Sequence, residues 1–261
     1  MADAERLSAE DEPYHREPIT YEAPYLDNLP TAPREKFAAN IAAIQKLKEI
    51  EQRVANGGSP AFEDEQKILA QYTGWGGLSD AFDPNKSTWS NEYSQLKAAL
   101  SESEYEAARS STLTAFYTPA TVIHPIYRAL ERFGVKGGKI LEPSMGTGAF
   151  LAHGHFGSSD AKFYGVELDS ITGRISKQLY QKANIQVTGY ENALLPDNYF
   201  DCVIGNVPFG NFQVNDPQYN RLHFPIHDYF FAKSIDKLRT GGIMAFITSS
   251  GTLDKKDDRA R

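Results

Sequence analysis

Cysteine is nearly absent from this sequence, and its scarcity limits the available chemistry. Cys202 is the only cysteine among the 261 residues. One thiol cannot form an internal disulfide and cannot build a cysteine-based zinc site alone. We therefore predict no disulfide framework and no metal site. Cys202 lies in an apolar run and is expected to be an inert core residue.

Long apolar runs are also missing. No uninterrupted stretch approaches the roughly 18 residues that a membrane-spanning helix needs. The opening segment, MADAERLSAEDE, is acidic where a secretory signal is basic and then apolar. We expect no membrane partner and a cytoplasmic protein.

An excess of positive charge is absent as well. The formal net charge of −7 disfavours tight non-specific binding to nucleic acid. Residues 1–30 hold eight acids and two arginines, however, so the rest of the chain carries only −1. Scattered prolines in the same segment predict an extended acidic arm over residues 1–32. A nucleic-acid partner is neither required nor excluded.

Residues 33–112 carry the signals of a helical accessory region. Four helices are expected, over residues 33–55, 59–73, 89–100 and 102–110. Gly57-Gly58 ends the first helix, and Ser101 with Glu104 forms a capping box before the last. We expect the glycine-flanked Trp75 to pack this region onto the rest of the molecule.

From residue 113 onward, short β-rich runs alternate with helical segments. The expected strands cover residues 139–142, 162–167, 184–188, 200–204 and 242–248. The expected helices cover residues 149–154, 170–182 and 227–239. This alternation predicts βαβ units and a parallel, doubly wound sheet. The fold class is therefore α/β and Rossmann-like over residues 113–261.

A glycine turn follows the first expected strand. Glu142-Pro143 ends that strand, and Gly146 and Gly148 allow a tight turn and a close approach to a ligand. Glu167 ends the second strand, where an acid can accept hydrogen bonds from ribose hydroxyls. Ligands of doubly wound sheets bind beyond the carboxyl ends of the strands, so these residues are candidates for one site.

The third glycine of the dinucleotide fingerprint is lacking, because Leu151 occupies its place. This absence disfavours NAD. An acid-proline turn with two glycines suits S-adenosyl-L-methionine instead. No pyrophosphate has to be held, and acids near the turn can bind the methionine ammonium group.

The fourth strand leads into Asn206-Val207-Pro208-Phe209, which places an amide and an aromatic ring at its carboxyl end. With Phe116–Pro119, the glycine turn and Glu167, this motif resembles the gamma-type N6-adenine DNA methyltransferases. Three further segments are similar to the methylase part of helicase-methylase fusion proteins of bacterial mobile elements. They are Tyr72–Gly77, Gly205–Gly210 and Thr248–Thr252, and the resemblance spans about residues 34–255.

The resemblance implies a class I methyltransferase that acts on the amino group of adenine in DNA. The Asn206 side chain and the Val207 carbonyl would accept the two amino hydrogens and stabilise the charge that builds as the methyl group transfers. Preorganised hydrogen bonds of this kind are worth about 3 to 4 kcal/mol each. Pro208 shapes the turn, and Phe209 would stack on a base flipped out of the duplex.

The same resemblance implies the residues that bind S-adenosyl-L-methionine. Phe116, Tyr117, Thr118 and Pro119 would pack over the methionine end, and Thr118 would also cap a helix. The remaining candidates lie at the strand ends: Glu142, Pro143, Gly146, Gly148 and Glu167. Glu191, with Asn192 as the alternative, would accept from the adenine amino group of the cofactor.

Val207 stands where the usual motif has its first proline. Valine leaves φ free and adds an N–H group, so the carbonyl is not aimed by a proline ring. An alternative hypothesis is therefore a catalytically weak or inactive module that acts in DNA binding or in evasion of host restriction. A third hypothesis, methylation of a protein glutamine or an RNA base, is disfavoured by the helical region.

The methyltransferases that this chain resembles have a seven-stranded sheet, whereas the sequence predicts a sheet truncated after strand five. We therefore expect an amino-terminal fragment of a longer protein, with target-recognition and helicase regions beyond Arg261. The near-neutral fold predicts weak DNA binding by the fragment alone.

Overall fold

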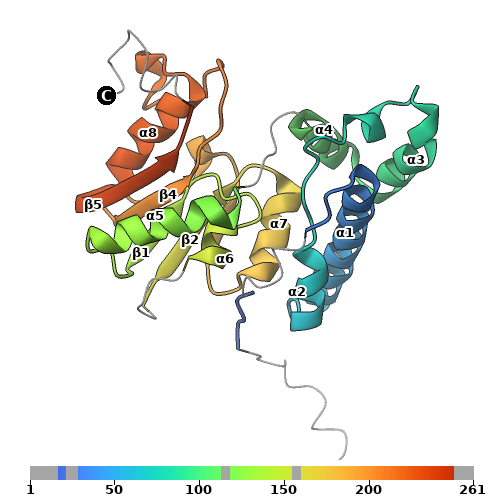
Figure 1. Cartoon of the computed structure of the whole chain (residues 1–261), viewed down its shortest axis with the longest axis horizontal. Coiled ribbons are helices and arrows are strands. Elements are labelled where there is room, and N and C mark those ends of the chain that lie inside the picture. The colour runs from blue at the N-terminus through green and yellow to red at the C-terminus, as the bar shows by residue number, and fades with distance from the viewer. Residues whose placement is uncertain (1–16, 22–28, 113–117, 155–159, 250–261) are drawn as a thin grey trace, which may run out of the picture.

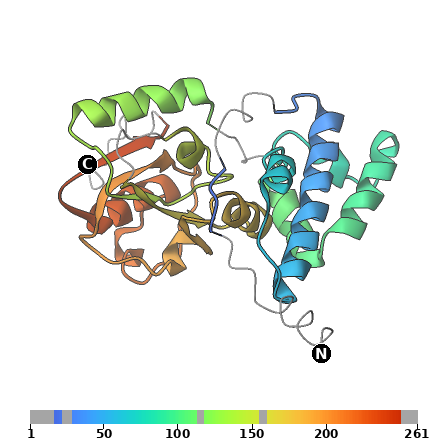
Figure 2. The same cartoon turned by 90° about the horizontal axis from the view of Figure 1, so that it is seen from below.

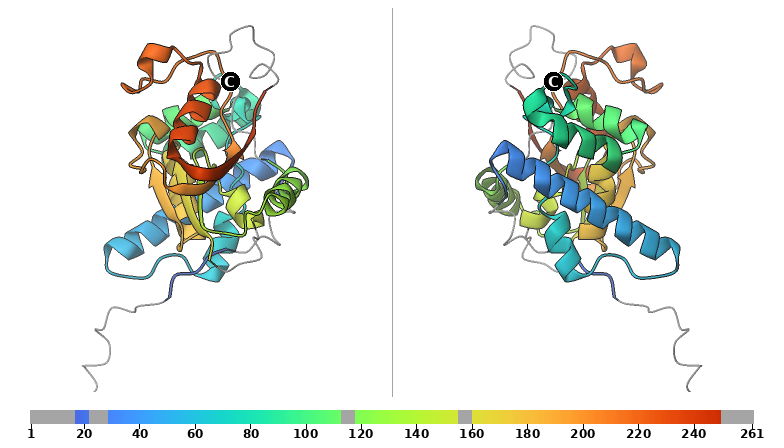
Figure 3. Two further views of the ribbon diagram at one scale, coloured as in Figure 1. Left: turned by 90° about the vertical axis from the view of Figure 1, so that its left-hand side faces the viewer. Right: turned by 90° about the vertical axis from the view of Figure 1, so that its right-hand side faces the viewer.

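The structure, a computed structural model, describes residues 17–21, 29–112, 118–154 and 160–249. A group of α-helices formed by residues 33–111 lies beside a parallel sheet that carries helices on both faces (Figure 1). The helical group makes one end of the molecule, and β5 with α8 makes the other (Figure 3). Within the described ranges, no helix is both long and apolar enough to cross a membrane.

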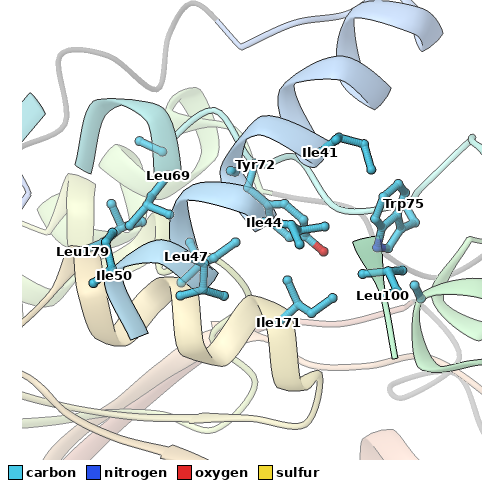
Figure 4. Packing of buried hydrophobic residues seen from close by; sticks show 14 of the residues in the cluster. Ile41, Ile44, Leu47, Ile50, Leu69, Tyr72, Trp75, Leu100, Ile171 and Leu179 are labelled. Atoms are coloured by element: carbon cyan, nitrogen blue, oxygen red, sulfur yellow. The ribbon is translucent and has the colours of Figure 1, made fainter. Parts of the chain in front are cut away.

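The first helix, α1 (Pro33–Ala55), has the predicted bounds. Pro33 opens it, where a missing N–H costs nothing, and Gly57 follows its end with φ +84°. Its buried apolar stripe packs against α2 and α7 (Figure 4). That stripe consists of Phe37, Ile41, Ala43, Ile44, Leu47 and Ile50.

The other helices of this region are α2 (Glu63–Leu69), α3 (Ser90–Ala99) and α4 (Glu102–Ser111). The predicted capping box is confirmed, since the Ser101 hydroxyl accepts from Glu104 N–H and the Glu104 carboxylate accepts from Ser101 N–H. Trp75 is 1% exposed within the core shared with α7, as predicted. Short 3-10 helices lie at Ser79–Phe82, Ser87–Trp89, Tyr190–Asn192 and Asn220–Leu222.

Helix α2 begins later than the predicted residue 59. The Arg53 guanidinium donates to the carbonyls of Ser59 and Pro60, and Ala61 N–H donates to the Gln178 side chain. These contacts use the backbone groups that a helix would need, so the segment stays extended until Glu63.

Five parallel strands form the sheet in the order β3-β2-β1-β4-β5. They are β1 (Lys139–Glu142), β2 (Lys162–Glu167), β3 (Asn184–Val187), β4 (Phe200–Asn206) and β5 (Leu238–Ile247). β5 begins before the predicted residue 242 because Leu238 pairs with Phe200 ahead of a register shift. Gly241, with φ +78°, lies in that irregular stretch. The predicted α/β, Rossmann-like fold is confirmed.

Helices cover both faces of the sheet. α5 (Ala120–Arg132) and α6 (Ala149–His153) pack on one face, and α8 (Ile226–Lys237) packs on the other. Side chains alternate along β4, so Cys202 and Ile204 face α5 while Val203 faces α8. Cys202 is fully buried and free, as predicted.

Helix α5 is not among the helix ranges that the sequence predicted. Pro119 occupies the N-cap position and its carbonyl accepts Val122 N–H, so the expectation that Thr118 caps this helix is wrong. Pro125 lies inside the helix and reads as a stop in the sequence. The helix tolerates it on its exposed side, while Ile123 and Tyr127 are buried on the other.

Helix α7 (Ser170–Leu179) lies between the sheet and the helical region (Figure 2). Residues 17–21 of the acidic arm are extended and pair with its end. Tyr21 N–H donates to the Leu179 carbonyl at 2.8 Å, and Gln181 N–H donates to the Ile19 carbonyl at 3.0 Å. Tyr21 is buried in the same core as α1 and α7.

Candidate functional site

The candidate site lies where the strand order reverses. The chain runs from β1 outward to β3 and then returns to the other side of β1 for β4 and β5. The carboxyl ends of β1 and β4 are therefore neighbours, as a ligand site at the switch point requires. A Cβ built on Gly205 would lie 3.4 Å from Glu142 Cγ, so the ends of the two strands are in contact.

The glycine turn after β1 is fixed by the two elements beside it. Gly146 has φ +54° and Gly148 has φ +79°, conformations that favour glycine. Gly146 N–H donates to Glu167 Oε2 at 2.8 Å, and the Ser176 hydroxyl donates to the Gly146 carbonyl at 2.9 Å. β2 and α7 therefore hold the turn from two sides.

The Tyr180 ring packs against Gly148 of the turn. A Cβ on Gly148 would lie 2.3 Å from the Tyr180 ring, so only glycine fits there. Tyr180 is 1% exposed, and its hydroxyl has no hydrogen-bond partner among the described residues. Burial and the charge of Glu142 raise the pKa of this phenol above its ordinary value of 10.

The Glu167 carboxylate already has two backbone partners. Oε2 accepts from Gly146 N–H and Oε1 accepts from Asp169 N–H, each at 2.8 Å. Burial raises the pKa of Glu167 to about 7, although these hydrogen bonds favour the charged form. Each oxygen keeps a second lone pair, so Glu167 can anchor the turn and still accept from a ligand.

Glu142 is the buried acid at the end of β1. It is 2% exposed, and Oε2 has no hydrogen-bond partner in the described part of the chain. Burial, and then the charge of Glu167, raises the pKa of Glu142 well above 4.5. An unpartnered buried acceptor beside a glycine turn fits a ligand that brings a cation, such as the ammonium group of S-adenosyl-L-methionine.

Asn206 ends β4 beside Glu142. Its Oδ1 atom is buried and has no hydrogen-bond partner within the described residues. The Val207 side chain is 1% exposed, and Val207 N–H donates to the Ile247 carbonyl of β5 at 3.2 Å. The N–H that a proline would lack therefore extends the β4–β5 ladder and fixes the backbone at residue 207.

The other candidate residues lie around this centre. Pro143 is buried under the turn, and the Phe209 ring is 47% exposed just past Pro208. Pro119 and Thr118 precede α5, whereas Phe116 and Tyr117 lie outside the described residues.

Glu191 differs from the expectation in one respect. Its carboxylate folds back over Gly189 and accepts from the Asn192 amide at 3.0 Å. Glu191 and Asn192, the two candidates for binding the cofactor adenine, are therefore hydrogen-bonded to each other. Among the described residues, neither of them forms a hydrogen bond with the glycine turn.

Sequence reasoning missed three residues that hold the site. Tyr180 and Ser176 contact the glycine turn from α7, and Asp169 both caps α7 and donates its N–H to Glu167. The capping role of Asp169 could have been predicted from the sequence, because aspartate is a common N-cap directly before a helix. The sequence carried no comparable signal for Tyr180 and Ser176, because their contacts depend on how α7 docks.

A hollow of about 410 Å³ lies at the opposite edge of the sheet, near the amino ends of β1 and β4. Its Asp201 carboxylate already accepts from Lys139 N–H and pairs with Arg239. No group of three or more histidine, cysteine, aspartate or glutamate side chains in the described ranges could hold a metal ion. The unpartnered acceptors therefore favour the carboxyl edge as the site.

Comparisons with known proteins identify the family of the chain. The model of the family described as Eco57I restriction-modification methylase matches residues 105–261. The chain is 28% identical over 238 residues to Defense against restriction protein B of Escherichia phage P1, covering 89% of this chain and 9% of that protein. It is 31% identical over 140 residues to modification methylase CviBIII of Paramecium bursaria Chlorella virus NC1A, covering 52% and 37%.

A solved modification subunit, assigned to a type I restriction enzyme of Vibrio vulnificus YJ016, is 18% identical with a TM-score of 0.44. That alignment covers 77% of this chain and 46% of the subunit. The chain thus spans less than half the length of each of these three relatives. Because the family model covers more than half of its residues, the chain belongs to the Eco57I restriction-modification methylase family.

Proposed function

We propose that this chain transfers a methyl group to the N6 amino group of adenine in DNA. The observation that carries the proposal is the Asn206 side chain, whose buried oxygen has no partner among the described residues at the carboxyl end of β4. A buried amide oxygen without a hydrogen-bond donor is available to accept a hydrogen bond from an amino group of the substrate.

Two acceptors of the chain would hold the target amino group. The exocyclic nitrogen of adenine is a poor nucleophile because its lone pair is delocalised into the ring. Asn206 Oδ1 and the Val207 carbonyl would accept its two hydrogens, draw the nitrogen toward tetrahedral geometry and stabilise the positive charge that develops. Phe209, exposed beside them, would stack on the extruded base.

The methyl donor is S-adenosyl-L-methionine, the cofactor of this methylase family. When bound, it supplies an electrophilic methyl group. Glu142 would pair with its ammonium group, which relieves the cost of an unpartnered buried carboxyl. Gly146 and Gly148 would let the backbone approach it, and Glu167 would accept from the ribose hydroxyls.

The backbone at Val207 supports catalysis over the inactive alternative. A proline at this position aims the carbonyl through its fixed ring. Here the N–H···O bond from Val207 to Ile247 restrains the same peptide by continuing the strand ladder. A valine with this bond therefore keeps an ordered carbonyl beside Asn206.

Replacement of Asn206 by alanine tests the proposal. We expect Asn206→Ala to lower methyl transfer to DNA by about 10²- to 10³-fold, the usual effect of losing one preorganised donor or acceptor. Cofactor affinity measured by calorimetry should stay within about twofold, because the side chain contacts the base rather than the methionine end.

Asn91→Ala is the matched control, since Asn91 is exposed on α3 and far from the sheet. It should leave both transfer and cofactor binding unchanged. Full transfer by the Asn206→Ala protein would refute the proposed role of this residue.

A further inference from the structure

The segment between β4 and α8, residues 207–225, leaves the site directly after Asn206 (Figure 1). We call it the β4–α8 loop. Its solvent-exposed side chains are unusually rich in carboxamides, which carry both donors and acceptors. The exposed amides are Asn211, Gln213, Asn215, Gln218 and Asn220.

Two phenylalanine rings of the loop face solvent. Phe209 is 47% exposed and Phe212 is 57% exposed. The Phe212 carbonyl accepts Ile226 N–H at 2.9 Å, which ties the residue to the start of α8. Its ring lies against Gly210, where an added Cβ would come within 2.6 Å of it. Phe212 therefore presents an exposed apolar ring three residues after Phe209 instead of entering the core.

The only acid of the loop points inward. Asp216 is 5% exposed, and its carboxylate accepts from Lys233 Nζ and from the Tyr229 hydroxyl, each at 2.8 Å. These partners hold the pKa of Asp216 below its ordinary value in spite of burial. The outward face of the loop therefore carries no acid and exposes one arginine, Arg221.

Asp216 also shapes the loop. Its carbonyl accepts the N–H groups of Tyr219 and Asn220, and its own N–H donates to the Asn220 side chain, all at 2.9 Å. The loop is thus braced internally and against α8. A braced surface loses little conformational entropy when it binds a ligand.

We propose that the outward face of the β4–α8 loop binds the DNA strand next to the target adenine, with Phe212 stacking on an unpaired base. This inference rests on the proposed function for its substrate class. Exposed aromatic rings bind unstacked bases with little sequence preference, and carboxamides match the donor and acceptor edges of bases. The exclusion of carboxylates from this face removes repulsion of phosphate groups.

Fluorescence anisotropy with a short labelled single-stranded oligodeoxynucleotide tests the proposal on the whole chain. We expect Phe212→Ala to weaken binding about 5- to 150-fold, the range for loss of one stacked base. Phe212→Tyr keeps the ring and should bind within about twofold of the unchanged chain. Phe133→Ala is the matched control, because Phe133 is 75% exposed at the end of α5, away from the loop.

Binding and methyl transfer are read separately, so the two proposals can fail independently. Weakened binding by Phe212→Ala in a chain that never methylates DNA would support the loop and overturn the proposed function. Unchanged binding by Phe212→Ala would overturn the loop proposal, as would equal losses in the Phe133→Ala control. No measurable binding of the unchanged chain to the oligonucleotide would also overturn it.

Discussion

Two buried oxygen atoms, Glu142 Oε2 and Asn206 Oδ1, face the switch point without a partner in the described part of the chain. An unsatisfied buried acceptor costs about 1 to 3 kcal/mol. Both belong to strand ends in contact with each other, at Glu142 and Gly205. A ligand bound at the switch point can recover this cost.

Glu142→Gln is expected to stabilise the cofactor-free chain and to weaken cofactor binding. Burial raises the pKa of Glu142 in the folded chain above 4.5. The free energy of unfolding is therefore unaffected by this carboxyl group below about pH 4.5, and it falls as the pH rises toward the folded pKa. Glutamine does not titrate, so the variant avoids a loss of about 1.4 kcal/mol per unit of raised pKa. Urea unfolding at about pH 4.5 and about pH 8 measures the difference.

Among the described residues, the titratable groups that act on Glu142 or feel its charge are Glu167 on β2, Tyr127 on α5 and Tyr180 at the end of α7. None of them supplies a positive charge, so a cationic ligand is needed to stabilise the ionised form. Calorimetric titration of S-adenosyl-L-methionine should show weaker binding by the more stable Glu142→Gln chain. A variant that gained stability and also kept full cofactor affinity would contradict this role.

At the scale of elements, the glycine turn is held by β2 and α7 together. Glu167 binds its N–H, Ser176 binds its carbonyl, and Tyr180 fills the space below Gly148. These contacts restrain the turn before any ligand binds. Preorganisation of this kind lowers the entropic cost of binding.

Gly148→Ala compared with Gly57→Ala measures this packing. Both glycines have positive φ, +79° and +84°, so alanine is strained at either position by about 1 kcal/mol. Nothing lies within 4 Å of a Cβ at Gly57, whereas a Cβ at Gly148 meets the Tyr180 ring at 2.3 Å. We expect an additional loss of about 1 to 3 kcal/mol for Gly148→Ala, together with loss of cofactor binding.

Chemical denaturation and cofactor titration of the two variants provide the measurement. Equal destabilisation by the two substitutions would mean that Tyr180 yields to the added methyl group. In that case α7 would not fix the turn.

Sequence patterns predicted the elements that carry local signals. The βα alternation located all five strands, and the motifs placed Glu142 and Asn206 at strand ends and Gly148 in the turn after β1. Patterns could not predict contacts that depend on docking, such as Tyr180 under Gly148 or the inward turn of Asp216 toward Lys233. The range of helix α5 was missed altogether, and the local preference of Pro125 opposes this helix, which packing stabilises.

At the scale of the molecule, α7 joins the helical region to the sheet. Arg174 pairs with Glu51 of α1 and Glu104 of α4, and the apolar cluster around α1 includes Met145 and Ile185 of the α/β part. A core that crosses the boundary couples the unfolding of both parts.

Cofactor binding should therefore stabilise the helical region. Both tryptophans, Trp75 and Trp89, lie in that region, so their fluorescence reports its unfolding. At a free concentration about 100 times its dissociation constant, S-adenosyl-L-methionine should add about 2.7 kcal/mol to the free energy of unfolding. It should also raise the single unfolding temperature measured by fluorescence. If the cofactor left the fluorescence transition unchanged but raised the unfolding temperature measured by circular dichroism, the helical region and the sheet would unfold independently.

The identity of the methylated nucleoside tests the central claim most directly. DNA incubated with the chain and S-adenosyl-L-methionine carrying a labelled methyl group can be digested to nucleosides and separated by chromatography with mass detection. The account predicts label in N6-methyldeoxyadenosine, lost with Asn206→Ala and kept with Asn91→Ala. Label in a methylated cytidine, or cofactor binding with no labelled nucleoside at all, would contradict it.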